Sequence, residues 1–166
     1  MYALVVNGKV LDTAALLAWP LDALRGCSTA PGCLAEVARL EPDRGTLLDL
    51  QTDALGLRVC SPGHEACEHA RRAALATGDL PRLSEVDLAV LALSIDLSLP
   101  LVSDDYALQN VVASLGGEPI SVQTSGITAT WRWEHRCQGC RKTWSGESPG
   151  EVCPVCGSNI LTKRQR

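Results

Sequence analysis

Short apolar runs alternate with longer amphipathic stretches over the first part of the chain. The apolar runs predict short strands ending at Asp12, Cys60, Val102 and Val122. Apolar residues recur at helical spacing in the stretches between and beside these runs, which cover residues 13–19, 31–40, 62–77, 83–97 and 106–115. Strands that alternate with helices predict a three-layer α/β/α domain with a central parallel sheet.

Local sequence signals set the ends of two of these helices. Thr29 is a candidate cap for the helix that opens at Pro31. Ser84 and Asp87 match the S-x-x-D capping pattern at the start of the helix over residues 83–97, and Pro100 follows its end. These signals make the helix over 83–97 the best defined of the predicted elements.

The composition of the chain changes near residue 126. Residues 123–130 (QTSGITAT) are small and polar and predict a linker. Residues 1–125 carry 8 Lys and Arg against 16 Asp and Glu, whereas residues 126–166 carry 7 against 3. We therefore expect an acidic domain over residues 1–125 that holds cations. A small basic domain over residues 126–166 would hold an anionic partner such as a nucleic-acid backbone.

Composition also limits the class of protein. The apolar fraction of 46% supports a core, and the absence of Phe means that Leu, Val and Ala must build it. No apolar run approaches the roughly 18 residues that cross a membrane. No basic and then apolar leader opens the chain. We therefore expect a cytoplasmic protein with no membrane partner.

The C-terminal domain contains two cysteine pairs with the spacing of metal-binding knuckles. Cys137-x-x-Cys140 and Cys153-x-x-Cys156 are separated by twelve residues. Four thiolates at this spacing predict a zinc ribbon with one tetrahedral Zn²⁺. A set of four Cys leaves no open coordination position, so this zinc is expected to fold the domain rather than to catalyse.

Basic and aromatic residues surround the two cysteine pairs. The candidate RNA-binding residues are Arg132, Arg136, Arg141, Lys142, Lys163, Arg164 and Arg166. Trp131, Trp133 and Trp144 are interleaved with them, and this combination fits binding to single-stranded or structured RNA. The alternative is that the tryptophans form the small core of the ribbon and the charges are a solvated surface.

Carboxylates recur at predicted strand ends and on the predicted helices. The candidate catalytic residues are Asp12, Glu36, Asp87, Asp104 and Asp105. Hard oxygen ligands of this kind suit Mg²⁺ or Mn²⁺, which activates water for attack on a phosphodiester. Each residue also has a purely structural explanation: Asp12 could cap a helix, Asp87 could complete the capping pattern, and Glu36 could be an exposed helix residue.

The acidic segments resemble those of a known family. VLDTAALLA, TAPGCLAEV, LSEVDLAVLAL and LVSDDYALQN are similar to the successive acidic blocks of the PIN-domain nucleases. The form SDDYALQNV followed by a zinc ribbon resembles the archaeal members of the NIN-one-binding protein family. These are endonucleases that mature the 3′ end of small-subunit (16S) rRNA. The resemblance covers nearly the whole chain in order.

The resemblance implies roles for the acidic residues. Asp12, Glu36, Asp87 and one or both of Asp104 and Asp105 would form the active site, and all of these except Glu36 would be Mn²⁺ or Mg²⁺ ligands. The usual T-x-D of PIN nucleases points to Asp105, and the neighbouring Asp104 leaves that assignment open. Ser103 would hydrogen-bond a ligand or a water.

The resemblance also implies a reaction and partners. Hydrolysis by a metal-activated water would leave a 3′-hydroxyl and a 5′-phosphate. The partners would be precursor small-subunit rRNA, the assembling small ribosomal subunit and a KH-domain assembly factor, with the ribbon docked on rRNA near the cleavage site. The N-terminal segment YALVVNGK lies ahead of the family's usual first strand and has no functional interpretation.

Two other functions fit the same sequence. One is a free-acting PIN nuclease of the VapC toxin type, although such chains normally end with the PIN domain. The other is a catalytically silent RNA-binding assembly factor that keeps the carboxylates for structural reasons.

Four cysteines lie outside the ribbon, and three states are open for them. Cys27, Cys33, Cys60 and Cys67 could be buried apolar thiols or could form two disulfides. Cys60 and Cys67 could also join His64 in a second zinc site, although the spacing is poor for a knuckle.

Overall fold

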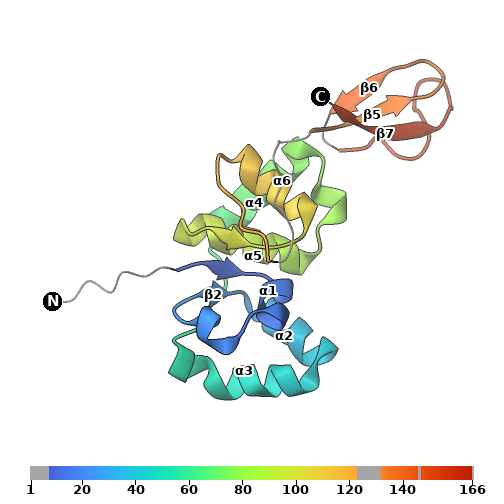
Figure 1. Cartoon of the computed structure of the whole chain (residues 1–166). Coiled ribbons are helices and arrows are strands. Elements are labelled where there is room, and N and C mark those ends of the chain that lie inside the picture. The colour runs from blue at the N-terminus through green and yellow to red at the C-terminus, as the bar shows by residue number, and fades with distance from the viewer. Residues whose placement is uncertain (1–7, 123–131, 146, 166) are drawn as a thin grey trace.

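The structure is a computed structural model that describes residues 8–122, 132–145 and 147–165 (Figure 1). For residues 132, 133 and 163–165 it describes the backbone alone. The predicted linker at 123–130, the N-terminal segment up to residue 7, Trp131 and Arg166 lie outside the described residues. The division into domains at residues 125 and 126 therefore stays a prediction.

A four-stranded parallel sheet forms the centre of the first domain. Its order is β3-β2-β1-β4, and the strands are β1 (Val10–Leu11), β2 (Ser28–Thr29), β3 (Arg58–Val59) and β4 (Leu101–Val102). The strand predicted to end at Val122 is reduced to a single parallel bridge between Val102 and Ile120. Because every pairing is parallel, the carboxyl ends of the strands lie along one edge of the sheet.

Helices cover both faces of this sheet. They are α1 (Thr13–Ala18), η1 (Leu21–Leu24), α2 (Pro31–Leu40), α3 (Pro42–Leu55), α4 (His64–Thr77), η2 (Leu80–Arg82), α5 (Glu85–Leu97) and α6 (Tyr106–Ser114). In Figure 1, α4, α5 and α6 lie on one side of β1, and α1, α2 and α3 lie on the other. The predicted three-layer α/β/α fold is confirmed.

The capping pattern before α5 is confirmed in detail. The Ser84 hydroxyl accepts a hydrogen bond from the N–H of Asp87 at 3.1 Å, and the Asp87 carboxylate accepts the N–H of Ser84 at 2.8 Å. The two side chains thereby satisfy N–H groups that the first turn of a helix leaves without partners. This reciprocal pair fixes the position of Asp87 at the start of α5.

Two predictions about local structure were wrong or incomplete. Thr29 does not cap α2: it lies in β2, and its hydroxyl donates to the carbonyl of Leu11 at 2.9 Å, while Ala30 is the cap residue. The helix α3 was not predicted, because its leucines point to several sides and only Leu48 and Leu55 are buried.

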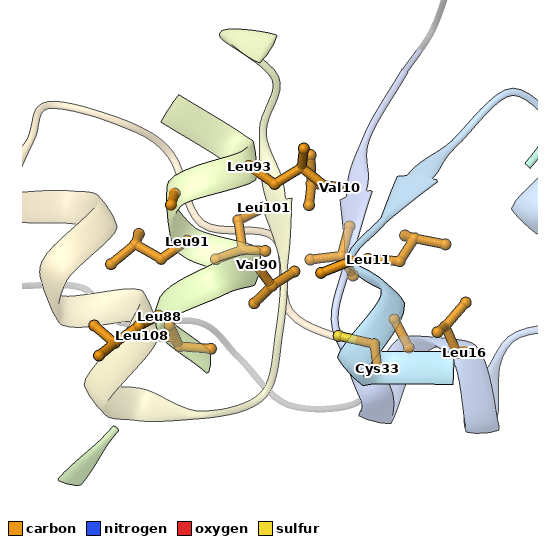
Figure 2. Close-up of a cluster of buried hydrophobic side chains, with 14 of the residues drawn as sticks. Val10, Leu11, Leu16, Cys33, Leu88, Val90, Leu91, Leu93, Leu101 and Leu108 are labelled. Carbon is orange, nitrogen blue, oxygen red and sulfur yellow. The ribbon is translucent and has the colours of Figure 1, made fainter. Parts of the chain in front are cut away.

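The core lies between α5 and the first two helices, with the sheet in the middle. Figure 2 shows Val10, Leu11 and Leu101 of the strands between side chains of α5 on one side and Leu16 and Cys33 on the other. The α5 helix is buried over most of its circumference, through Leu88, Val90, Leu91, Ala92 and Leu93. The core is built of Leu, Val, Ala and Cys, as the composition predicts.

The C-terminal part forms a separate antiparallel sheet of order β6-β5-β7. Its strands are β5 (Arg132–Cys137), β6 (Thr143–Ser145) and β7 (Ile160–Gln165). His135 on β5 is buried and faces Trp144 and Thr162 across the sheet, with 3.0 Å between its Nδ1 and the Thr162 Oγ1. Within the described part of the chain, no helix has both the length and the apolar character needed to cross a membrane.

Candidate active site and cysteine cluster

The pairing of β1 with β4 brings the first carboxylates together. Leu11 is in register with Val102, so the next residues, Asp12 and Ser103, lie side by side at the carboxyl edge of the sheet. The N–H of Asp12 donates to the Val102 carbonyl at 3.2 Å, and the Ser103 hydroxyl hydrogen-bonds the Asp12 carboxylate. Ser103 is therefore placed beside a candidate ligand, as the family resemblance implies.

Asp12 is held in a buried and electrostatically unfavourable position. Its side chain is 7% exposed, and its Oδ1 caps α1 by accepting the N–H of Ala15 at 2.8 Å. Burial raises the pKa of Asp12 above its ordinary value, hydrogen bonds from Ser103 and Ala15 oppose that shift, and the charges of Asp104 and Asp87 add to it. Three carboxylates therefore act on one another at this edge of the sheet, and a cation there would stabilise all of them.

The neighbouring residues Asp104 and Asp105 have different surroundings. One oxygen of Asp104, which is half-buried, accepts the Ser121 hydroxyl at 2.6 Å and the Val122 N–H at 2.7 Å. Asp105 is exposed and caps α6 by accepting the N–H of Ala107 at 2.7 Å. The charge of Asp104 thus reaches Asp12, whereas Asp105, which caps a helix as Asp12 and Asp87 also do, is exposed.

Glu36 reaches the same edge from α2. It accepts a hydrogen bond of 2.5 Å from the hydroxyl of Thr13, the residue after Asp12. The buried thiol of Cys33 lies one turn earlier on the same helix. Burial raises the pKa of Cys33, the Thr13 and Thr29 hydroxyls oppose this, and the charges of Asp12 and Glu36 add to it. Glu36 is thereby held next to the residue that follows Asp12, and both carboxylates act on the Cys33 thiol and raise its pKa.

Three residues that were not predicted from the sequence support these carboxylates. Thr13 fixes Glu36, Ser121 fixes Asp104, and Cys33 lies beneath both Asp12 and Glu36. The position of Thr13 directly after Asp12 was a usable signal. Ser121 had no such signal, because only the tertiary fold brings it to Asp104.

The donor set of this edge fits a hard divalent cation. Among the described residues, only the four ribbon cysteines form a group of three or more candidate ligands whose ligand atoms all lie within 4.8 Å of one another. The carboxylates are more widely spaced. Mg²⁺ and similar ions commonly keep several waters and take only one or two carboxylates directly, and carboxylate oxygens are their preferred protein ligands.

The four predicted ribbon cysteines do come together. The Sγ atoms of Cys137 and Cys156 are 3.3 Å apart, and those of Cys140 and Cys153 are 3.7 Å apart. Backbone N–H groups point at the sulfurs: Gly139 donates to Cys137 at 3.3 Å, and Val155 donates to Cys153 at 3.4 Å. Such donors stabilise thiolates, so the cluster could hold a metal ion.

Two further features of the cluster fit a bound metal. The hydroxyl and the N–H of Ser158 lower the pKa of Cys156 to about 6, which favours its thiolate. A Cβ on Gly139 would overlap the Ser158 side chain and lie 3.2 Å from the Cys156 sulfur, so only glycine allows the knuckles to approach this closely. Four thiolates in this arrangement are the donor set of structural zinc sites.

The structure places only part of the predicted RNA-binding set. Arg136 is half-buried on β5, and Arg141 and Lys142 are exposed after the first knuckle. The side chains of Arg132, Lys163 and Arg164, like Trp133, are outside the described part, and so is the whole of Arg166. Trp144 is half-buried opposite His135, so it belongs to the small core of the ribbon.

The remaining four cysteines are free thiols. Cys27 and Cys33 are buried, Cys60 is half-buried and Cys67 is exposed, and no disulfide links them. Cys60, His64 and Cys67 do not form a metal-ligand cluster within the described residues. The first of the three states, that of buried apolar thiols, therefore holds for Cys27 and Cys33, whereas Cys60 and Cys67 are unpaired but not buried.

The parallel sheet and the carboxylates at its edge can now be compared with known protein families. A family model described as the PIN domain of ribonuclease matches residues 10–97, from β1 to the end of α5. This range includes Asp12, Glu36 and Asp87, and it ends just before β4. The chain therefore contains a PIN domain.

Three curated relatives identify the family more closely. "Endoribonuclease Nob1" of Pyrococcus abyssi is 36% identical over 140 residues, covering 83% of this chain and 85% of the relative. "Endoribonuclease Nob1" of Archaeoglobus fulgidus is 32% identical, covering 96% and 92%. "Ribonuclease VapC1" of Thermoplasma acidophilum is 34% identical, covering 91% and 75%. The chain belongs to the Nob1 family of PIN-domain proteins.

The raised pKa of Asp12 leads to a prediction about stability. In the unfolded chain Asp12 titrates near 3.8, and in the folded protein its pKa is higher. The contribution of Asp12 to the stability of the fold is therefore fully present below about pH 3.8. It is lost as the pH rises through the pKa that Asp12 has in the folded protein. We expect Asp12→Asn, which keeps the cap on α1, to raise the melting temperature by a few degrees at pH 7 when no Mn²⁺ or Mg²⁺ is present.

The pH dependence provides the check. Thermal unfolding followed by circular dichroism should show the advantage of Asp12→Asn at pH 7 and its disappearance as the pH approaches 4. An equal or lower melting temperature of the variant at pH 7 would contradict the unfavourable setting assigned to Asp12.

Proposed function

We propose that this chain is a divalent-metal-dependent endoribonuclease that cleaves precursor small-subunit rRNA at its 3′ end in the cytoplasm. The observation that carries the proposal is that the register of β1 and β4 places the buried Asp12 beside the end of β4, where the charges of Asp104 and Asp87 raise its pKa. Relatives that match most of the chain are named endoribonucleases, which supports the same activity.

In this proposal the carboxylates hold Mn²⁺ or Mg²⁺. A bound ion of this kind lowers the pKa of a coordinated water and stabilises the charge that develops on the phosphodiester. Asp12, Asp87 and Asp104 supply the ligands, and Glu36 completes the acidic set. Hydrogen bonds already orient each carboxylate. Asp12 accepts them from Ala15 and Ser103, and Asp87 accepts one from Ser84. Asp104 accepts them from Ser121 and Val122, and Glu36 accepts one from Thr13. Little reorganisation is then needed when substrate binds.

The C-terminal ribbon has the role of binding the RNA substrate in this proposal. Zn²⁺ held by Cys137, Cys140, Cys153 and Cys156 folds residues 126–166 into a domain that contacts RNA. The positive charge of this region supports that role, with Arg136, Arg141 and Lys142 exposed or half-buried at its surface. The assembling small subunit, including a KH-domain assembly factor, is the setting in which we expect the enzyme to act.

The similarity to VapC1 supports one other candidate, a free-acting ribonuclease. The two candidates share the catalytic site and differ in substrate. The VapC1 match covers 91% of this chain and so extends into the region of the first cysteine pair. The position of the cut in precursor rRNA is therefore what separates the two candidates. A silent assembly factor is disfavoured because the charges of Asp87 and Asp104 act on the buried Asp12 carboxylate, which destabilises the fold unless a cation offsets them.

The chemistry of the products tests the activity itself. Incubation of the purified chain with end-labelled RNA and Mn²⁺ should give fragments with a 3′-hydroxyl and a 5′-phosphate, identified by ligation and by phosphatase sensitivity. Fragments that end in a 2′,3′-cyclic phosphate, or cleavage without a divalent ion, would indicate a contaminating nuclease. No cleavage of any RNA would favour the silent factor.

Metal binding distinguishes Asp104 from Asp105. Because the charge of Asp104 reaches Asp12 and Asp105 caps α6, Asp104→Asn should weaken Mn²⁺ binding by about tenfold or more, equivalent to the loss of roughly 1.4 kcal/mol. Asp105→Asn, which keeps a capping side chain, should change it by less than about threefold. Isothermal titration of the full chain measures both, and the reverse order would assign the ligand to Asp105.

A further inference from the structure

A cavity of about 430 Å³ lies in the C-terminal domain, away from the carboxylates. It is lined by Arg136, Cys137, Gln138, Arg141 and Leu161. Its volume is in the range of small-molecule binding sites, which run from about 300 to 1,000 Å³. The metal site proposed above uses the sulfur of Cys137 but none of the other four side chains.

The register of the β5–β7 sheet explains how the cavity is built. Arg136 pairs with Thr143 on β6 and with Leu161 on β7, so these three side chains share one face of the sheet. The neighbouring residue His135 lies on the other face with Trp144, where it is buried. The cavity therefore opens on the face opposite the small core of the ribbon.

The backbone at Arg141 is in a conformation that a side chain makes costly. Its φ is +62°, in the left-handed region, and Ser98 is the other non-glycine residue with a positive φ in the described part of the chain. Arg141 follows the last cysteine of the first knuckle. At the same place in the second knuckle stands Gly157, with a φ of +75°. The first knuckle thus has an arginine at a position where glycine would adopt the backbone conformation at a lower energetic cost.

The lining has the chemistry of a site for one nucleotide. Two guanidinium groups present planar donor pairs that match phosphate oxygens. Neither Arg136 nor Arg141 forms an ion pair with a carboxylate within the described residues. Leu161 is 42% exposed and offers an apolar surface to a base, and the Gln138 amide can hydrogen-bond a base edge.

We propose that this cavity binds one unpaired nucleotide of the RNA substrate, with the phosphate on Arg136 and Arg141 and the base against Leu161. The inference rests on the proposed function in that it takes RNA as the ligand. It adds a defined site on the ribbon, and it gives Arg141 a reason to occupy a position suited to glycine.

The decisive variant is Arg141→Gly, because it removes the guanidinium and also relieves the backbone. Its matched control is Lys142→Ala, which removes one positive charge from the next residue, outside the cavity lining. The probe is a short, labelled single-stranded RNA, titrated with the full-length chain in buffer without Mn²⁺ or Mg²⁺. Fluorescence anisotropy is measured over a series of salt concentrations.

We expect Arg141→Gly to weaken RNA binding by about tenfold or more and Lys142→Ala by about twofold. The slope of log affinity against log salt should fall by about 0.7 for the lost phosphate contact. The melting temperature of Arg141→Gly should equal or exceed that of the wild type, which separates loss of the site from loss of the fold. Arg136→Lys, which keeps the charge but loses the planar donor pair, should also weaken binding by several-fold.

The outcomes separate this proposal from the proposed function. If the wild-type chain binds RNA and Arg141→Gly and Lys142→Ala weaken binding equally, the nucleotide site is wrong and the nuclease proposal stands. The wild-type chain can also cleave RNA in Mn²⁺ while Arg141→Gly and Arg136→Lys bind RNA as tightly as the wild type does. In that case the cavity is likewise not the nucleotide site. If the wild type neither binds nor cleaves RNA, the proposed function fails with it.

Discussion

Asp12→Asn is expected to reduce Mn²⁺-dependent RNA cleavage by at least about a hundredfold. Asp12 is the buried carboxylate on which the charges of Asp87 and Asp104 act. A metal ion that stabilises a developing charge contributes several kcal/mol to the transition state, and each 1.36 kcal/mol corresponds to about tenfold in rate. Single-turnover cleavage of end-labelled RNA measures the loss directly.

A matched variant shows that the loss is local. Asp22→Asn changes a carboxylate that is 89% exposed and lies in η1, away from the sheet edge, and it should cleave at the wild-type rate. Asn at position 12 still caps α1, so Asp12→Asn should fold as well as the wild type. Cleavage that continues at the wild-type rate in Asp12→Asn would remove Asp12 from the active site.

Loss of the metal proposed for the four-cysteine cluster is expected to unfold the C-terminal sheet and leave the PIN domain folded. The three strands β5, β6 and β7 enclose little apolar material, with Cys137, Cys153 and His135 as the buried side chains in the described part of this region. Structural zinc supplies about 10–16 kcal/mol in small domains, far more than such a core can provide. Cys153→Ser should therefore lose the metal and the protection of β5 and β7 from hydrogen exchange.

RNA binding should fall with the ribbon, by about tenfold or more, because the basic surface is no longer assembled. Metal content is measured by native mass spectrometry, and strand protection by hydrogen exchange. Cys67→Ser serves as the control, since Cys67 is an exposed free thiol on α4 and should leave the metal in place. A Cys153→Ser protein that keeps both bound zinc and protected strands would contradict the assigned role.

The features that the sequence predicted well depend on local rules. The capping pair of Ser84 and Asp87 and the two cysteine knuckles each rest on residues close in sequence. The same rules placed Asp12 at the junction of β1 and α1. Signals of this kind work because a few neighbouring residues decide the backbone hydrogen bonds.

The features that the sequence could not settle depend on contacts between distant segments. Asp104 and Asp105 are adjacent, and they are distinguished by the approach of Ser121 and Val122 to Asp104 and by the charge of Asp104 on Asp12. Thr29 was expected to cap α2, but the hydrogen bond from its hydroxyl to Leu11 across the sheet holds it in β2. The helix α3 lacks a clear apolar face, so periodicity did not reveal it.

Cleavage of precursor small-subunit rRNA tests the central claim most directly. The wild-type chain, in Mn²⁺, is mixed with labelled RNA that spans the mature 3′ end, presented free and within assembling small subunits, and the cut is mapped at single-nucleotide resolution. We expect one cut at the mature 3′ end, with a 3′-hydroxyl on the upstream fragment. Cutting at scattered or unrelated positions, or no cutting in either form of the substrate, would contradict it.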